Sequence, residues 1–72
     1  ADVQAAFSIT NHQNGYISIS ARSFKDYNVQ TIMEAMGGGG HFNAAATQIY
    51  ERNIDEVKND LIALIKEREN EQ

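Results

Sequence analysis

The sequence predicts an α/β fold of the α+β type, in which helices pack on one small β-sheet. Two early segments alternate between apolar and polar residues, a pattern typical of strands with one buried face. Two later segments repeat apolar residues every three or four positions, as amphipathic helices do. A chain of 72 residues is long enough for one domain and too short for a second hydrophobic core.

The first two predicted strands form a hairpin. Apolar and polar residues alternate over residues 3–10 and, more regularly, over residues 16–22. The segment between them ends in Asn14-Gly15, a dipeptide typical of tight hairpin turns. His12 lies in this turn, where we expect a solvated loop residue rather than a ligand.

A short helix is predicted next, ending at four glycines over residues 37–40. Asn28 is a good N-cap for it, and the apolar residues at 29, 32, 33 and 36 fall on one helical face. After the glycines, residues 44–50 predict a third strand, small at its start and larger at its end. The sequence leaves open whether this strand runs parallel to its neighbour.

A second helix is predicted after Asn53. Glu56, three residues further on, completes a capping-box pattern, and apolar residues at 54, 57, 61, 64 and 65 supply one buried stripe. The polar tail over residues 67–72 is expected to fray. The predicted order of elements is therefore strand, strand, helix, strand, helix.

The net charge of −4 is unevenly distributed along the chain. Residues 1–50 carry three acidic and two basic side chains, whereas residues 51–72 carry seven acidic and four basic ones. No broad basic patch is present, so binding to long duplexes is disfavoured while a short anionic ligand remains compatible. Cysteine is absent, which excludes disulfides and cysteine-ligated metal sites. No stretch approaches the ~20 apolar residues that span a bilayer, so we expect no membrane contact by this chain.

The glycines at 37–40, followed by His41, are the strongest candidate for a binding element. Backbone without side chains lets a ligand touch the amide groups directly, and successive exposed N–H groups form a nest for anions such as phosphate. The alternative is a helix stop, because glycine is favoured just past a helix C-terminus. One glycine would serve that purpose, so four glycines, a histidine and three alanines favour a surface kept bare for a ligand.

Arg22 is the second candidate, at the end of the second predicted strand and next to Ser23. Its guanidinium offers a planar fork of donors suited to phosphate or to a base edge. If the third strand pairs with the second, Arg22 and the glycine segment converge at one edge of the sheet. One objection is that a helix C-terminus carries partial negative charge, which disfavours an anion beside it.

Features of self-contained catalysis are missing from the sequence. The carboxylates of the first 50 residues are scattered, and no His/Asp group has the spacing of metal ligands. A serine with His41 could form a nucleophile and base, but no third, orienting residue is evident. We therefore expect no catalytic residue, metal ligand or cofactor in this chain.

At Gly38-Gly39-Gly40-His41 the chain resembles the DHH-associated (DHHA) substrate domain of the DHH phosphoesterases. This superfamily includes RecJ-type exonucleases, oligoribonucleases and cyclic dinucleotide phosphodiesterases. A longer agreement is similar to the GdpP (YybT) type of cyclic-di-AMP phosphodiesterase. It consists of four ordered segments: Ile19 to Ser23, Asn28 to Gln30 with Ile32 to Glu34, Gly37 to His41, and Ala45 to Gln48.

The resemblance implies that residues 1–72 are the DHHA domain of a longer bacterial protein. A preceding DHH domain would hold two Mn²⁺ ions and hydrolyse cyclic di-AMP, and this fragment alone would be inactive. Substrate would be bound by Arg22 and Ser23 and by the Gly38, Gly39, Gly40 and His41 element. The parent would be anchored in the cell membrane, with this domain at the cytoplasmic face, and could form a homodimer.

Two alternatives remain open at this point. The same domain could serve an oligoribonuclease or RecJ-like exonuclease, with a short oligonucleotide as its partner instead of a cyclic dinucleotide. It could also be a non-catalytic RNA-binding module, which would bind longer RNA better and with steep salt dependence.

Overall fold

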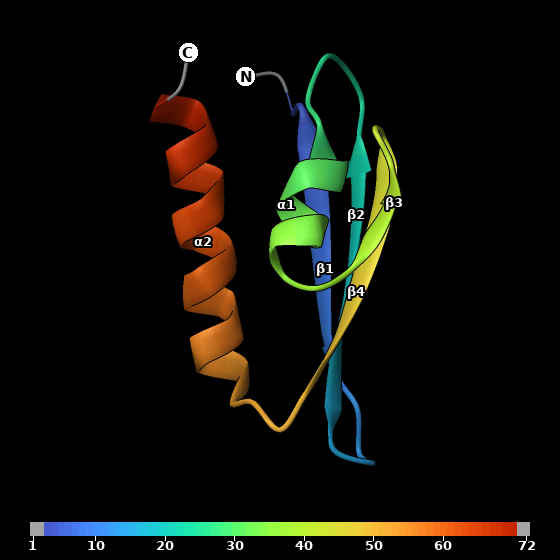
Figure 1. The fold of residues 1–72 in the computed structure, drawn as a ribbon, viewed down its shortest axis with the longest axis vertical. Coiled ribbons are helices and arrows are strands. Elements are labelled where there is room, and N and C mark those ends of the chain that lie inside the picture. Colours follow the sequence, from blue (N-terminus) through green and yellow to red (C-terminus); the bar gives the residue numbers. More distant parts are fainter. Residues whose placement is uncertain (1–2, 71–72) are drawn as a thin grey trace.

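The computed structural model describes residues 3–70, which fold into a four-stranded antiparallel sheet with two helices. The elements are β1 (Ala5–Asn11), β2 (Tyr16–Ser23), α1 (Val29–Ala35), β3 (Gly39–His41), β4 (Ala44–Tyr50) and α2 (Ile54–Asn70). Both helices lie on the same side of the sheet (Figure 1). The predicted α+β class and the packing of helices on a small sheet are confirmed.

The strand order is β1-β2-β4-β3, and every neighbouring pair is antiparallel. The orientation of the third predicted strand is thereby settled: β4 runs antiparallel to β2. The sequence prediction missed β3, a short edge strand that begins at Gly39. Glycine is depleted in strands, so the pattern of this segment indicated a loop.

One face of the sheet and the two helices form the core. The inward residues of β2 are almost fully buried, with exposed fractions of 2% at Ile17 and 0% at Ile19. Helix α1 contributes Val29 and Met33, and helix α2 contributes Val57. The side chains that alternate with these strand residues point away from both helices. We call this uncovered side of the sheet the open face.

The first hairpin is confirmed, with small shifts at its ends. β1 pairs with β2 from Ala5↔Ser23 to Asn11↔Ile17, so the strand begins two residues after the predicted start at Val3. Val3 is 65% exposed. His12 is not simply solvated as predicted, because its ring stacks on a neighbouring tyrosine and its Nε2 lies 2.8 Å from the hydroxyl of Ser18.

Helix α1 is held at both ends as its sequence indicates. The Asn28 side chain accepts hydrogen bonds from the backbone N–H groups of Gln30 and Thr31, which confirms it as the N-cap. At the other end, Gly37 adopts a φ of +87°. This left-handed conformation closes the helix, and it favours glycine because it has no Cβ.

Helix α2 also begins as predicted and then runs further than predicted. The Asn53 side chain accepts from the N–H of Asp55, and the carboxylate of Glu56 accepts from the N–H of Asn53. The expected fraying from residue 67 is wrong, because α2 continues to Asn70. Arg68 holds this last turn, since its guanidinium lies 3.7 Å from the Tyr27 ring centroid. Residues 71–72 of the predicted tail lie outside the described residues.

Candidate functional site

Arg22 and His41 come together on the open face. In the sheet register, Arg22 of β2 pairs with Ala44 of β4, and Ala44 pairs in turn with His41 of β3. Directly paired residues project to the same side of a sheet, and two strand spacings separate the outer pair by about 10 Å. The intervening residue is an alanine, so only a methyl group stands between the guanidinium and the imidazole.

A groove lies beside the cross-strand row formed by Arg22, Ala44 and His41. It has a volume of about 250 Å³ and is lined by Arg22 and by small residues, namely Ser20, Ala21, Gly39, Gly40, Ala44, Ala45 and Ala46. In the next row, Ser20 pairs with Ala46 and Ala46 with Gly39, so a hydroxyl, a methyl and bare backbone form one strip. The strip carries no side chain larger than a serine, which leaves its main chain uncovered on the open face.

The four glycines divide into two pairs with different structural tasks. The N–H groups of Gly37 and Gly38 donate to the carbonyls of Glu34 and Met33, at 3.0 and 2.8 Å, and so terminate α1. These two amides are therefore not available to an anion, and the helix-stop interpretation applies to them. Gly39 and Gly40 belong to β3, on the open side of the fold.

Gly39 and Gly40 differ in what a side chain would meet. A Cβ at Gly39 would have nothing within 4 Å, and its φ lies outside the left-handed range. A Cβ at Gly40 would lie 2.6 Å from the carbonyl oxygen of Ala44, and φ there is +144°. Gly38 is equally tight, because a Cβ would clash with the Ala46 carbonyl and with Thr47. Gly38 and Gly40 are thus required by packing, whereas Gly39 leaves space in the groove.

Ser23 is not brought together with the other candidates. It follows Arg22 in the same strand, so its side chain points toward the helix side. Its hydroxyl is buried and has no hydrogen-bond partner among residues 3–70. Its backbone N–H donates to the carbonyl of Asn43 at 3.0 Å, which ties β2 to the turn between β3 and β4.

The end of α1 does not disfavour an anion at the groove as strongly as the sequence suggested. The N–H groups of Gly37 and Gly38 already donate to two carbonyls at this end of the helix. A third, the Met36 carbonyl, accepts a 3.0 Å hydrogen bond from the hydroxyl of Thr47, a buried side chain on the helix side of β4. The carbonyls of Met33, Glu34 and Met36 at the end of α1 therefore have partners within the fold, on the other side of the sheet from Arg22. Sequence analysis missed this role of Thr47.

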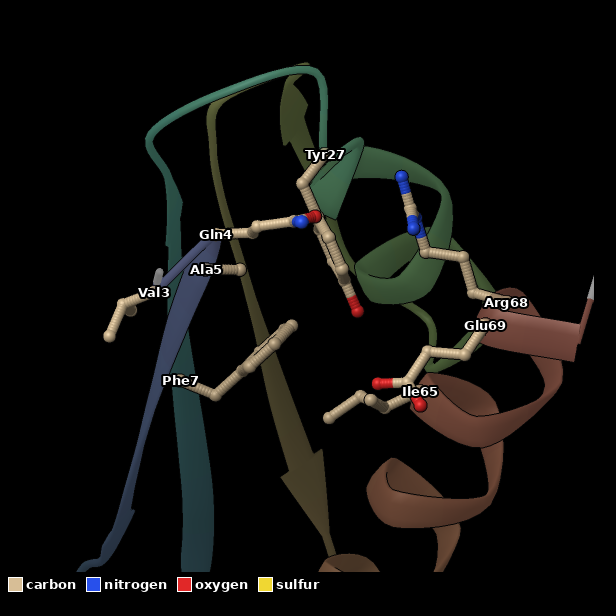
Figure 2. A pocket seen from close by; sticks show the side chains of 8 residues that line it. All are labelled: Val3, Gln4, Ala5, Phe7, Tyr27, Ile65, Arg68 and Glu69. Carbon is tan, nitrogen blue, oxygen red and sulfur yellow. The ribbon is translucent and has the colours of Figure 1, made fainter. Parts of the chain in front are cut away.

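A larger hollow of about 470 Å³ lies on the helix side, between β1 and the end of α2 (Figure 2). Phe7 and Ile65 point into it, and Arg68 stacks beside Tyr27 at one wall. Burial raises the pKa of the Tyr27 hydroxyl; nearby Arg68 opposes this effect and Glu69 adds to it. None of the predicted site residues lines this hollow.

No three His, Cys, Asp or Glu side chains among residues 3–70 gather where they could hold a metal ion. Within the same range, no helix is long and apolar enough to cross a membrane. The groove, with its arginine and bare backbone, and His41 across Ala44 from that arginine, are therefore the features that any functional assignment must explain.

The fold and the groove define a small α+β domain with one covered and one open sheet face. A profile of the DHHA1 domain matches residues 1–67, and the chain belongs to this family. Over 63 residues it is 51% identical to the cyclic-di-AMP phosphodiesterase PdeA of Listeria monocytogenes, covering 88% of this chain and 10% of PdeA. Over 57 residues it is 42% identical to GdpP of Bacillus subtilis, covering 79% of this chain and 9% of GdpP.

The fold is also similar to a solved structure, the pGpG-specific phosphodiesterase PggH from Vibrio. The TM-score is 0.69 at 25% identity, over 88% of this chain and 24% of that one. The chain thus spans about a tenth of the cyclic-di-AMP phosphodiesterases and about a quarter of PggH. PdeA, GdpP and PggH are phosphodiesterases, and the predicted membership of a phosphodiesterase family is confirmed.

Proposed function

We propose that this domain holds the nucleotide substrate of a bacterial cyclic-di-AMP phosphodiesterase. The observation that carries the proposal is the placement of Arg22 and His41 on the open face, on either side of Ala44. The names of the PdeA and GdpP relatives support cyclic di-AMP as the substrate. A phosphodiester is an anion with planar bases attached, which suits a guanidinium, an imidazole and exposed backbone.

Each candidate site residue has a definite task in this proposal. Arg22 donates a two-pronged hydrogen bond to phosphate oxygens, and His41 donates to phosphate or stacks on a base. Gly39 leaves the strip at Ala46 without a side chain, so that the sugar-phosphate reaches the main chain, while Gly40 lets β3 pack closely against β4. Gly38 and Ser23 act indirectly: Gly38 allows β4 to approach closely, and the Ser23 amide holds the β3–β4 turn in place.

Hydrolysis itself belongs, in this proposal, to a preceding DHH domain of the parent protein. That domain would hold two Mn²⁺ ions, which would activate the attacking water; no three His, Cys, Asp or Glu side chains among residues 3–70 gather to hold a metal ion. This chain contributes by fixing the position of the phosphodiester, which lowers the entropic part of the barrier. We further propose a membrane-anchored parent with this domain at the cytoplasmic face; one relative is described as a membrane protein fused to ribosomal protein bL9.

The test is turnover of cyclic di-AMP by the full-length protein that carries this domain. Arg22→Ala and His41→Ala should each lower kcat/KM by about 10-fold or more, because each removes a hydrogen bond to a charged group worth ~1.5–3 kcal/mol. Lys58→Ala on α2 is the control for loss of a positive charge and should leave kcat/KM unchanged. Unchanged kcat/KM for both groove variants would contradict the proposal.

A second candidate substrate is a linear dinucleotide. It is favoured by the structural similarity to PggH, which is described as specific for pGpG. Comparing kcat/KM for cyclic di-AMP and for the linear dinucleotides pApA and pGpG distinguishes the two candidates. A module for long RNA is disfavoured by the net charge of −4.

A further inference from the structure

Three aromatic rings form a stack at the other end of the open face from Arg22. The rings of His12 and Tyr16 lie 4.1 Å apart between centroids with an interplanar angle of 10°. The Tyr16 and Tyr50 rings follow at 5.6 Å and 28°. We call these three residues the aromatic stack. Sequence analysis missed it, because it depends on the pairing of Tyr16 with Tyr50 across β2 and β4.

Tyr50 is the outer member of the aromatic stack. It is 61% exposed, and its hydroxyl donates a 3.0 Å hydrogen bond to the side-chain oxygen of Gln48. Strand β3 pairs with β4 only over residues 44–46, so at this end the edge of β4 that faces away from β2 has no partner strand among residues 3–70. A hollow of about 470 Å³ occupies that place, lined by Gly37, Gly38, Ala46, Thr47, Gln48 and Tyr50. Its size lies in the range of small-ligand sites.

This hollow lies next to the groove beside Arg22. Ala46 lines both, and the glycine segment passes from one to the other. From Ala44, opposite Arg22, to Tyr50 there are six residue steps along β4, or about 20 Å at 3.3 Å per residue. A stacked nucleic-acid strand covers this distance with about six nucleotides at 3.4 Å each, and an extended strand with fewer.

The chemistry along this path suits a polyanion. None of the four strands contains an aspartate or glutamate, although the chain has ten acidic residues. The open face between the two ends presents hydroxyl and amide groups from Ser18, Ser20 and Gln48. The nearest acid in sequence is Glu51, which follows Tyr50 where the chain leaves the sheet at a φ of +58°.

We propose that the hollow beside Tyr50 is a base-stacking subsite and that the open face binds linear single-stranded oligonucleotides longer than two nucleotides. This inference rests on the proposed function, which places one phosphate at Arg22 and His41. A base of the same strand then stacks on the Tyr50 ring. Such stacking is tolerant of base identity, because every base presents a flat π-face. A second protein chain is a poorer occupant, since the path is polar and small apart from the two tyrosines.

The experiment titrates the isotope-labelled 72-residue chain with oligoadenylates of two, four and six nucleotides and follows the backbone amide signals by NMR. The dinucleotide should shift signals of Arg22 and of residues 39–41 only. The hexanucleotide should also shift Gly37, Gln48 and Tyr50, and should bind about tenfold more tightly. That gain is the size expected for one base stacked on an aromatic side chain.

Tyr50→Leu should remove the tenfold rise in affinity from dinucleotide to hexanucleotide. Its affinity for the dinucleotide should stay within about twofold of that of the natural chain. Tyr50→Phe keeps the ring and should retain the gain; Ile62→Ala, at an exposed apolar residue of α2, controls for loss of apolar surface. Because the ratio of the two affinities is taken within one variant, loss of stability cancels. Equal affinity for both lengths, a gain that survives in Tyr50→Leu, or signals at Tyr50 that shift with protein concentration alone would overturn the inference. Absence of dinucleotide binding would instead contradict the proposed function.

Discussion

Arg22 and His41 share Ala44 as their cross-strand neighbour, one from β2 and the other from β3. Nineteen positions in sequence separate them, yet the register sets both side chains on the open face with a single methyl group between them. The small size of residue 44 is therefore part of the site, because it keeps the space between the two donors open for a ligand.

Ala44→Val tests this relationship without removing either donor. Valine is favoured in strands, so the free energy of unfolding should stay equal or rise slightly. The added methyl groups fill the space between guanidinium and imidazole, and affinity for the dinucleotide should fall about tenfold or more. Calorimetric titration and urea unfolding measure the two quantities. Thr10→Val, on the same face but outside the groove, is the matched control; an equal loss of affinity in both variants would show that the effect is not local.

Gly39→Ala and Gly40→Ala should separate binding from stability. A methyl group at Gly39 enters open space in the groove, so nucleotide affinity should fall while unfolding changes by less than about 0.5 kcal/mol. At Gly40 the methyl group meets the Ala44 carbonyl oxygen at a positive φ, which should destabilise the fold by about 1–3 kcal/mol. Urea unfolding of both variants measures the difference. Equal stability of the two proteins would contradict the assignment of Gly40 to packing.

The local parts of this fold could be predicted from sequence because short-range chemistry fixes them. Asn28 caps α1, Asn53 caps α2, and the alternation in β1 and β2 marks one buried face. Strand β3 could not be predicted in this way. Its glycines carry no strand propensity, and the strand forms because β4 supplies a partner edge.

The candidate site depended on longer-range information. Convergence of Arg22 with the glycine segment was expected only if the third predicted strand paired with the second, and the antiparallel β2–β4 pair meets that condition. Four identical residues give no sign that the first two glycines end α1 and the last two belong to β3. The sheet face to which the Ser23 side chain projects could not be known either, because it depends on the pairing that places Arg22 on the open face.

Thr47→Val should destabilise the domain through the end of α1. The Thr47 hydroxyl is buried and donates to the Met36 carbonyl at 3.0 Å. Valine has nearly the same shape but no donor, so a partly buried carbonyl loses its partner at a cost of about 1–3 kcal/mol. The midpoint of urea unfolding measures this loss. Gln48→Val, at the neighbouring exposed position, is the control and should change stability far less.

Stability should fall at high pH through Tyr27. Burial raises the pKa of its hydroxyl above the usual value of 10.0, an effect that Arg68 opposes and Glu69 increases. The folded state therefore holds this proton more tightly than the unfolded state does. Its contribution to stability is complete below about pH 10 and is lost as the pH rises through the folded pKa.

Tyr27→Phe isolates that contribution, because phenylalanine keeps a ring for Arg68 to stack on and has no proton to lose. The free energy of unfolding, measured in urea between pH 8 and 11, should fall less steeply above pH 10 in this variant than in the natural chain. Tyr50→Phe is the control for removing a tyrosine hydroxyl at an exposed position. Parallel curves for Tyr27→Phe and the natural chain would mean that the buried hydroxyl does not couple ionisation to folding.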